Sequence, residues 1–282
     1  MHRSALDSLR AWQRDGERVA LEGGRVFVKR AGAGRHLTLL HGFPTCSWDW
    51  SKIWDELVEQ RTVLAMDLLG FGHSDKPNRP YSFAEHADRV EVLWRRDRVE
   101  STTLVAHDYS VTLALELLAR SDALPVHIDG VVFLNGALRG RLHRARLIQT
   151  VLASAIGPAV ARLVRRPQFE RAFCSVFEHA PSADELAAFW ASASAQDGQL
   201  RSPQLLHYIR DRREQAGRWE GVLDSTRVPL SFIWGVKDPV SGKHVLESVE
   251  HRGTVTALPV GHYPHWEAPT EVLEAILAAT RA

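Results

Sequence analysis

Leu104-Val105-Ala106-His107-Asp108-Tyr109-Ser110-Val111 is an apolar run that passes through one aspartate and opens into the Leu- and Ala-rich segment 112–118. This pattern predicts a strand, a sharp turn and a helix. Ala106 and Ser110 are small enough to flank a strained turn at positions where glycine is commoner. We therefore expect a nucleophile elbow with Asp108 at its tip.

The aspartate at this tip restricts the chemistry that we expect. A carboxylate can attack saturated carbon, whereas its attack on an ester carbonyl would give a reactive anhydride. An alkyl-aspartyl ester is therefore the expected intermediate. Two alternatives stay open: Ser110 is a rival nucleophile, although that frame moves the tip into the helix, and Asp108 could simply cap the helix that follows.

The composition is that of a soluble globular enzyme. The chain has 282 residues, of which 45% are hydrophobic and 24% charged, and its 35 basic and 34 acidic residues leave a net charge of +1. Such a balance does not suggest a nucleic-acid partner. Cys46 and Cys174 are too few for a disulfide framework or a zinc site, so we expect no metal and a reducing compartment. Residues 1–16 lack the apolar core of a signal peptide, which favours a cytoplasmic protein.

Strand and helix patterns alternate along most of the chain. Gly23-Gly24 predicts a hairpin turn between two short strands. The predicted strands of the sheet are 18–22, 25–29, 36–40, 61–67, 101–108, 128–136, 229–235 and 253–258. Alternation of this kind predicts an α/β fold with a mostly parallel central sheet and helices on both faces.

Residues 138–223 show helical patterns only, which predicts a cap inserted into a core formed by residues 1–137 and 224–282. Within the cap, residues 147–164 are apolar enough to suggest a membrane span. Gln149, Gly157-Pro158 and Arg162 interrupt that run, so we expect a lid helix and no span. The glycines of 69–75 lack the third glycine of a nucleotide-binding loop, and no cofactor is expected.

Two further residues complete a predicted catalytic triad. Asp238 follows the strand 229–235, and His262 lies in the loop after the strand 253–258. The order nucleophile, acid, histidine is that of α/β-hydrolases. His262 is expected to activate water, and Asp238 to fix its tautomer and balance its charge. His265 is an alternative base in the same loop.

The segment His41-Gly42-Phe43-Pro44 follows the predicted strand 36–40. Such a loop can present backbone N–H groups at the end of a central strand. We expect the N–H groups of Phe43 and Tyr109 to form an oxyanion hole that stabilises the charge formed when water attacks the aspartyl ester. Taken alone, the HGFP segment is equally typical of a tight turn.

These motifs resemble the α/β-hydrolase superfamily, in the branch with an aspartate nucleophile that contains epoxide hydrolases and haloalkane dehalogenases. More narrowly, the chain is similar to the mesoderm-specific transcript proteins and their bacterial relatives. The resemblance spans most of the chain and is carried by HGFPTCSWDWSKIW at 41–54, LGFGHSDKP at 69–77, AHDY at 106–109, LLHYIRDRR at 205–213 and GHYPHWEAP at 261–269.

The resemblance implies a small apolar organic substrate and a choice between two reactions. Family epoxide hydrolases bind the epoxide oxygen with two cap tyrosines, of which only Tyr208 has a counterpart here. Dehalogenases commonly have a tryptophan after the nucleophile, where this chain has Tyr109. Epoxide opening is thus favoured, with Tyr208 as the acid and with His41 and Trp190 as further substrate contacts. A dehalogenase, an ester hydrolase and a non-catalytic binding protein stay open, as do a monomer and a homodimer.

Overall fold

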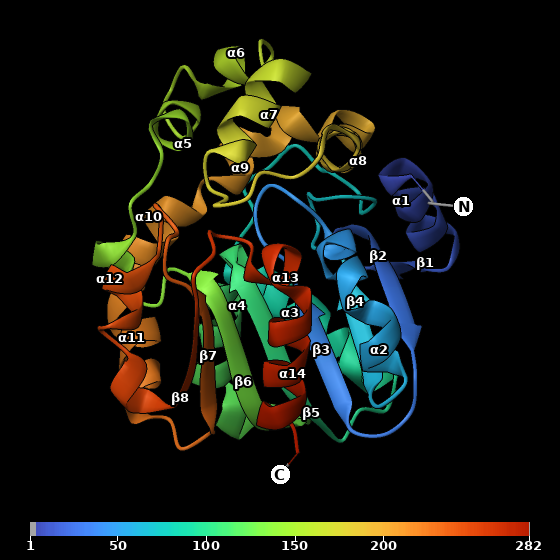
Figure 1. The fold of residues 1–282 in the computed structure, drawn as a ribbon, viewed down its shortest axis with the longest axis vertical. Coiled ribbons are helices and arrows are strands. Elements are labelled where there is room, and N and C mark those ends of the chain that lie inside the picture. The colour runs from blue at the N-terminus through green and yellow to red at the C-terminus, as the bar shows by residue number, and fades with distance from the viewer. Residues whose placement is uncertain (1–3, 282) are drawn as a thin grey trace.

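A computed structural model describes residues 4–281 and has one eight-stranded sheet at its centre (Figure 1). The strands are β1 (Glu17–Leu21), β2 (Gly24–Ala31), β3 (His36–Leu40), β4 (Thr62–Met66), β5 (Ser101–Asp108), β6 (His127–Gly136), β7 (Leu230–Gly235) and β8 (Thr254–Leu258). Their order is β1-β2-β4-β3-β5-β6-β7-β8. Strand β2 runs antiparallel to β1 and β4, and every other pairing is parallel. The predicted fold class is confirmed.

The central strands are buried on both faces, because helices cover the sheet on each side. Along β5, Leu104 and Ala106 belong to one apolar cluster and Val105 to the other, as the alternation of side chains in a strand requires. The hairpin between β1 and β2 pairs Leu21 with Gly24. Its turn is therefore Glu22-Gly23, one residue earlier than the sequence suggested.

Helices of the core pack on the two faces of the sheet. The first face carries α3 (Phe83–Arg96) and α4 (Tyr109–Ala119), and the second carries α1 (Ala5–Arg14), α2 (Trp54–Val58) and α14 (Pro269–Ala279). The short helices α12 (Lys243–Leu246) and α13 (Pro264–Glu267) follow β7 and β8. Helix α4 is surrounded by the protein on almost every side, since ten of its eleven residues are buried.

The chain between β6 and β7 forms helices only, as predicted for this part of the described residues. They are α5 (Leu147–Leu152), α6 (Gly157–Ala161), α7 (Arg166–Cys174), α8 (Ala183–Ser194), α9 (Ser202–Leu205), α10 (Tyr208–Glu214) and α11 (Ala216–Ser225). Helices α5 to α9 lie beyond the carboxyl ends of the parallel strands (Figure 1). Helix α11 instead runs beside α4, where Trp219 Nε1 donates a hydrogen bond of 2.8 Å to Glu116. The last helix before β7 is thus packed on the core.

The segment 147–164 differs from the single lid helix that we expected. It forms two short helices, α5 and α6, because Pro158 starts a new helix and Gly157 approaches the preceding turn closely. A Cβ atom on Gly157 would lie 1.9 Å from the Leu152 carbonyl oxygen. Among the residues that the structure describes, no helix is long and apolar enough to cross a membrane.

Candidate active site

Asp108 is the last residue of β5 and immediately precedes α4. Its φ of 46° and ψ of −104° are strained for a residue with a side chain, as expected at a sharp strand-to-helix turn. The side chain accepts no hydrogen bond from the first turn of α4, although Asp108 occupies the capping position. The simple capping role is therefore not observed, and the carboxylate faces a cavity instead.

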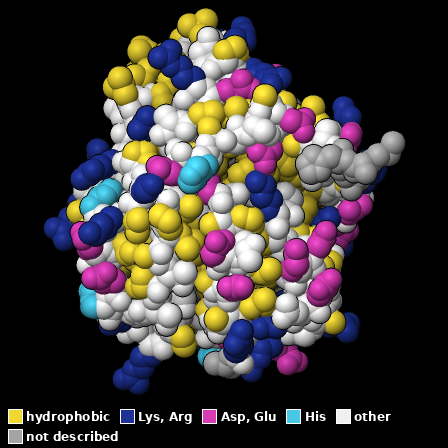
Figure 2. Space-filling view, in the orientation of Figure 1, with side chains coloured by type: hydrophobic (Ala, Val, Ile, Leu, Met, Phe, Trp, Pro, Cys, Tyr) yellow, Lys and Arg dark blue, Asp and Glu magenta, His cyan; other side chains and the backbone are white. Residues whose placement is uncertain are grey.

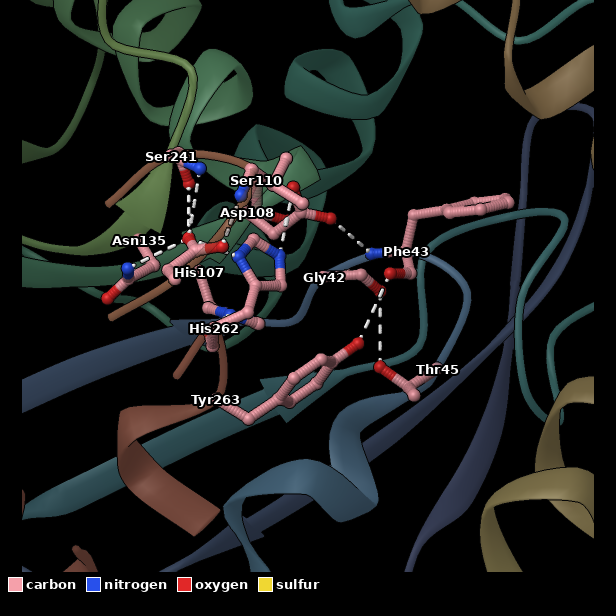
Figure 3. A network of polar contacts seen from close by, with 12 residues as sticks. Gly42, Phe43, Thr45, His107, Asp108, Ser110, Asn135, Ser241, His262 and Tyr263 are labelled. Atoms are coloured by element: carbon pink, nitrogen blue, oxygen red, sulfur yellow. Dashed lines mark hydrogen bonds and ion pairs between the residues drawn. The ribbon is translucent and has the colours of Figure 1, made fainter. Parts of the chain in front are cut away.

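The loop after β3 closes tightly over this turn. A Cβ atom on Gly42 would lie 2.7 Å from His107 Nδ1 and 2.9 Å from the Asp108 Cβ, so only glycine fits without displacement. The next residue, Phe43, donates its N–H to Asp108 Oδ2 at 3.0 Å (Figure 3). Phe43 therefore lies where the oxyanion-hole hypothesis requires.

Ser110 and Tyr109 lie in the first turn of α4. The Ser110 hydroxyl is buried and donates to the His41 carbonyl oxygen at 2.5 Å, which ties the elbow to the loop after β3. Ser110 is not among the residues that line the cavity, so the alternative nucleophile is not placed to react. The Tyr109 N–H belongs to the first helical residue and has no acceptor within the helix, which leaves it suited to an oxyanion.

His262 lies between two carboxylates, and Figure 3 shows its ring beside one of them, that of Asp108. Its Nδ1 is 2.7 Å from Asp238 Oδ2, and its Nε2 is 3.5 Å from Asp108 Oδ1. The three residues lie at or just beyond the carboxyl ends of β5, β7 and β8, and each residue is at most 5% exposed. The structure thus brings the three predicted triad residues together. The alternative base, His265, is buried against Trp50 and does not line the cavity.

Asp238 is held by more donors than the sequence indicated. Its Oδ2 accepts hydrogen bonds from Asn135 Nδ2 at 2.9 Å and from both the N–H and the hydroxyl of Ser241, and its Oδ1 accepts from the Val240 N–H at 2.7 Å. Burial favours the neutral acid, but the charge of His262 and these donors outweigh it and lower the pKa of Asp238 to about 2. Asp238 is therefore ionised at neutral pH.

Charge dominates the environment of the histidine as well. Burial alone would lower the pKa of His262, but the carboxylates of Asp238 and Asp108 raise it to about 10. Burial would likewise raise the pKa of Asp108, and the hydrogen bond and charge of His262 instead hold it below its usual range. The resting site consequently contains one imidazolium between two carboxylates.

A cavity of about 540 Å³ extends from Asp108 and His262 towards the inserted helices. This volume is typical of a site for one small organic molecule. Most of its wall is apolar, and its lining includes Phe43, Phe71, Leu152, Val164, Phe169, Phe173, Val176, Leu205 and Val240. An apolar wall around one carboxylate is suited to a substrate with little polarity beyond its reacting group.

Three predicted substrate contacts do not line this cavity. His41 is fully buried, and its ring bonds to the Gly42 carbonyl and the Leu68 N–H. Tyr208 is 1% exposed and packs between Arg212 and Tyr109. Trp190 packs against Phe169, which does line the cavity, with the two ring centroids 5.3 Å apart. His41 and Tyr208 are buried in the interior and Trp190 is half-buried, and sequence spacing could not distinguish these positions from one inside the cavity.

Arg212 is a site residue that sequence reasoning missed. It reaches from α10 to the elbow, where its Nε donates to Thr112 Oγ1 at 2.8 Å and its Nη2 lies 3.5 Å from the Asp108 carbonyl oxygen. Arg212 is buried, and its guanidinium carbon lies 4.3 Å from the centre of the Tyr208 ring. Its position depends on how the inserted helices fold back, for which the sequence carries no local signal. Asn135 was also missed, although a polar residue near the end of an apolar strand is a signal that could have indicated it.

A second buried polar cluster lies beneath the triad and consists of Asp49, His107 and His265. One possible ligand atom from each lies within 4.8 Å of the others, so the set could supply one oxygen and two nitrogens to a metal ion. Burial, however, raises the pKa of Asp49 well above its usual value, lowers that of His107 to about 3 and lowers that of His265. Each of these shifts favours the uncharged form of its group, and His107 Nε2 bonds to the His262 carbonyl oxygen at 2.8 Å. Through this contact the cluster supports the loop that carries His262.

The elbow, the triad geometry and the parallel sheet together define a hydrolase of the α/β class, and the family comparison agrees. The family model described as the alpha/beta hydrolase fold matches residues 35–269. The chain belongs to this family.

Curated relatives match over nearly the whole chain. LipZ of Mycobacterium tuberculosis, whose name describes it only as a hydrolase, is 38% identical over 96% of this chain and 97% of its own. The mesoderm-specific transcript homolog protein of Bos taurus is 36% identical over 96% of this chain and 87% of its own. The predicted resemblance to this group is confirmed.

Solved structures confirm the fold. An α/β-hydrolase fold protein from Burkholderia ambifaria has a TM-score of 0.78 and 21% identity, covering 93% of this chain and 97% of its own. The haloalkane dehalogenase DatA from Agrobacterium tumefaciens has a TM-score of 0.78 and 19% identity, covering 94% of this chain and 96% of its own.

The imidazolium between two carboxylates predicts how stability depends on pH. Because the folded state raises the pKa of His262 from 6.5 to about 10, the stabilisation is complete below pH 6.5 and is lost as the pH rises towards 10. Urea denaturation across this range should show a falling free energy of unfolding in the wild type. His262→Gln should remove most of the decline, and an equal decline in that variant would contradict the assignment.

The position of Tyr208 predicts that removing its hydroxyl has little effect on catalysis. Because its side chain does not line the cavity, Tyr208→Phe should change kcat by no more than about twofold, far less than the loss of a general acid would. Steady-state kinetics on the best epoxide or haloalkane would check this. A fall of about 10²-fold or more would restore the role that the sequence suggested for this tyrosine.

Proposed function

We propose that the protein hydrolyses small apolar substrates through a covalent ester on Asp108. The observation that carries this proposal is the arrangement of the Asp108 carboxylate. One oxygen accepts the Phe43 N–H at 3.0 Å, and the other faces His262 Nε2 at 3.5 Å, beside an apolar cavity of about 540 Å³. A buried, ionised carboxylate in a site of this kind is an effective nucleophile.

The first step is attack on saturated carbon. An Asp108 oxygen forms a bond to the substrate carbon while the bond from that carbon to an epoxide oxygen or a halide breaks, and the electron pair leaves with that atom. The nucleophile loses no proton in this step, so His262 need not act as a base. The Phe43 N–H stays on the oxygen that becomes the ester carbonyl.

The second step is hydrolysis of the ester. His262 removes a proton from water, the hydroxide oxygen bonds to the Asp108 carboxyl carbon, and the N–H groups of Phe43 and Tyr109 stabilise the oxyanion. Collapse of this intermediate releases the alcohol, which takes the proton from His262. The Asp108 acid that is left, which carries one oxygen from water, passes its proton to His262, and this restores the carboxylate and the imidazolium of the resting site.

The charges of the site favour this order of events. In the resting site His262 is flanked by two carboxylates, and both raise its pKa. Ester formation neutralises Asp108 and removes one of these charges, so the pKa of His262 falls. The imidazolium then gives its proton to the alkoxide formed from an epoxide, or to bulk water when a halide leaves, and the neutral His262 is the base of the second step.

We also propose that residues 138–223 act as a cap over the cavity. The lining includes Leu152 of α5, Phe173 of α7 and Leu205 of α9, all from the inserted helices. They face Asp108 and His262 from the opposite side of the cavity. The cap therefore supplies the apolar wall that selects the substrate, and the core supplies the reacting groups.

Two leaving groups are compatible with this site. The preference for an epoxide depended on Tyr208, which does not line the cavity, and the only lining tyrosine among the described residues is Tyr263. The Tyr263 hydroxyl donates to the Phe43 carbonyl oxygen at 3.2 Å. A halide needs N–H donors rather than an acid, and the lining contains Gln149, Gln168 and Gln199. An epoxide and a haloalkane are therefore both candidate substrates.

His262→Gln should convert the enzyme into a trap, because the first step needs no base and the second does. Turnover should fall by about 10²- to 10⁴-fold while an adduct accumulates on Asp108. Intact-mass spectrometry would also identify the electrophile. An epoxide adds its whole mass, whereas a haloalkane adds its mass less that of the hydrogen halide.

Asp108→Ala combined with His262→Gln is the matched control and should form no adduct. Substrate turnover by the wild type, together with neither adduct nor turnover in His262→Gln, would favour an ester hydrolase in which His262 activates water directly. Reversible binding without turnover in the wild type would favour a binding protein. An Asp108→Ala variant with full activity would overturn the proposed mechanism.

A further inference from the structure

We propose that the outer face of helices α5 to α7 docks on anionic phospholipid membranes. We call this face, formed by Leu147, Ile156, Arg162, Leu163 and Arg165, the cap face. Figure 2 shows hydrophobic side chains mixed with Lys and Arg at the end of the molecule where these helices lie in Figure 1. The proposal concerns binding and does not depend on the chemistry of Asp108.

The apolar side chains of this face are unusually exposed. Of the six large hydrophobic residues with exposed side chains in the described part of the chain, four lie between residues 147 and 163. Leu147 is 81% exposed, Leu163 71% and Ile156 62%. Single exposed hydrophobic residues are ordinary, but a cluster on neighbouring helices indicates an interaction surface.

The same region carries most of the charge asymmetry of the molecule. Residues 139–171 contain eight of the 35 basic residues, all arginine, but only one of the 34 acidic residues, Glu170. The side chains of Arg162, Arg165 and Arg171 are exposed and form no ion pair with a carboxylate in residues 4–281. The net charge of the whole chain is only +1, because the residues outside this region are acidic overall.

Exposed leucine and isoleucine beside unpaired arginine match the interface of an anionic bilayer. The apolar side chains can enter the acyl boundary, while the guanidinium groups bind phosphate. A second copy of this chain is a poor occupant, since two such faces would oppose arginine with arginine. A nucleic acid would satisfy the arginines but would leave the leucines exposed to water.

The cap face adjoins the mouth of the cavity. Ile148 of α5 and Gln168 and Arg171 of α7 are exposed and also line the cavity, so the opening lies between these two helices. Docking would bring this mouth to the bilayer surface. An apolar substrate that is dissolved in the membrane could then enter the cavity without crossing bulk water, and this consequence alone depends on the proposed function.

Vesicle sedimentation tests the docking. The wild-type protein should bind vesicles of phosphatidylglycerol and phosphatidylcholine in equal parts and bind pure phosphatidylcholine weakly, with the difference reduced by salt. The double variant Arg162→Glu and Arg165→Glu should lower the partition coefficient by about tenfold or more. The double variant Leu147→Ser and Leu163→Ser should lower it severalfold on both vesicles.

Matched controls lie elsewhere on the molecule. Arg35→Glu with Arg227→Glu makes the same change of charge at exposed sites before β3 and β7, at the opposite edge of the sheet. Val92→Ser with Val255→Ser removes the other two exposed hydrophobic residues. Neither control should alter vesicle binding.

Three outcomes would overturn the proposal: no binding of the wild type to the anionic vesicles, an equal loss in the Arg35 and Arg227 control, or full binding by the Leu147 and Leu163 variant. The last would indicate a general polyanion site of the kind that a nucleic acid uses. Activity on a water-soluble substrate without vesicles should be unchanged in all four double variants, so failed docking and failed catalysis are measured separately.

Discussion

The strained backbone at Asp108 is the constraint on which the rest of the site depends. A residue with φ of 46° persists only when its surroundings leave it no alternative. Gly42 closes on the turn, the Ser110 hydroxyl ties it to the loop after β3, and Arg212 reaches the Asp108 carbonyl oxygen from the inserted helices. Residues of the core and of the inserted helices therefore both hold Asp108 at the tip of the turn. The position of the carboxylate depends on each of these contacts.

Charge balance is the second requirement of this site. Three titratable groups lie within hydrogen-bonding or ion-pairing distance in a buried space, where an unpaired charge would be costly. Burial opposes the charge of Asp238, but the charge of His262 and the hydrogen bonds that His262, the Val240 N–H and Asn135 donate keep the carboxylate ionised. The electrostatic field at His262 thus changes mainly when Asp108 gains or loses its own charge.

The sequence predicted the parts of the site that follow from strand order. Asp108 ends a parallel strand, and Asp238 and His262 each lie in the loop after one, so all three were expected to meet at one edge of the sheet. The positions of Tyr208, Trp190 and Arg212 depend instead on how short helices pack between β6 and β7. Helical periodicity indicates which side of a helix is buried. It does not show whether that side packs in the protein interior or lines a substrate cavity, because both give the same pattern.

The same distinction explains why the segment 147–164 was difficult to interpret. Its apolar residues suggested one buried lid helix, yet the chain breaks at Gly157 and leaves Leu147, Ile156 and Leu163 outside while Leu152 and Val164 line the cavity. An apolar run that serves two surfaces has no single helical face, so its hydrophobicity exceeds what either surface alone requires. The high hydrophobicity of the segment was visible in the sequence. Only the paths of α5 and α6 show which of its apolar residues line the cavity and which lie on the exposed cap face.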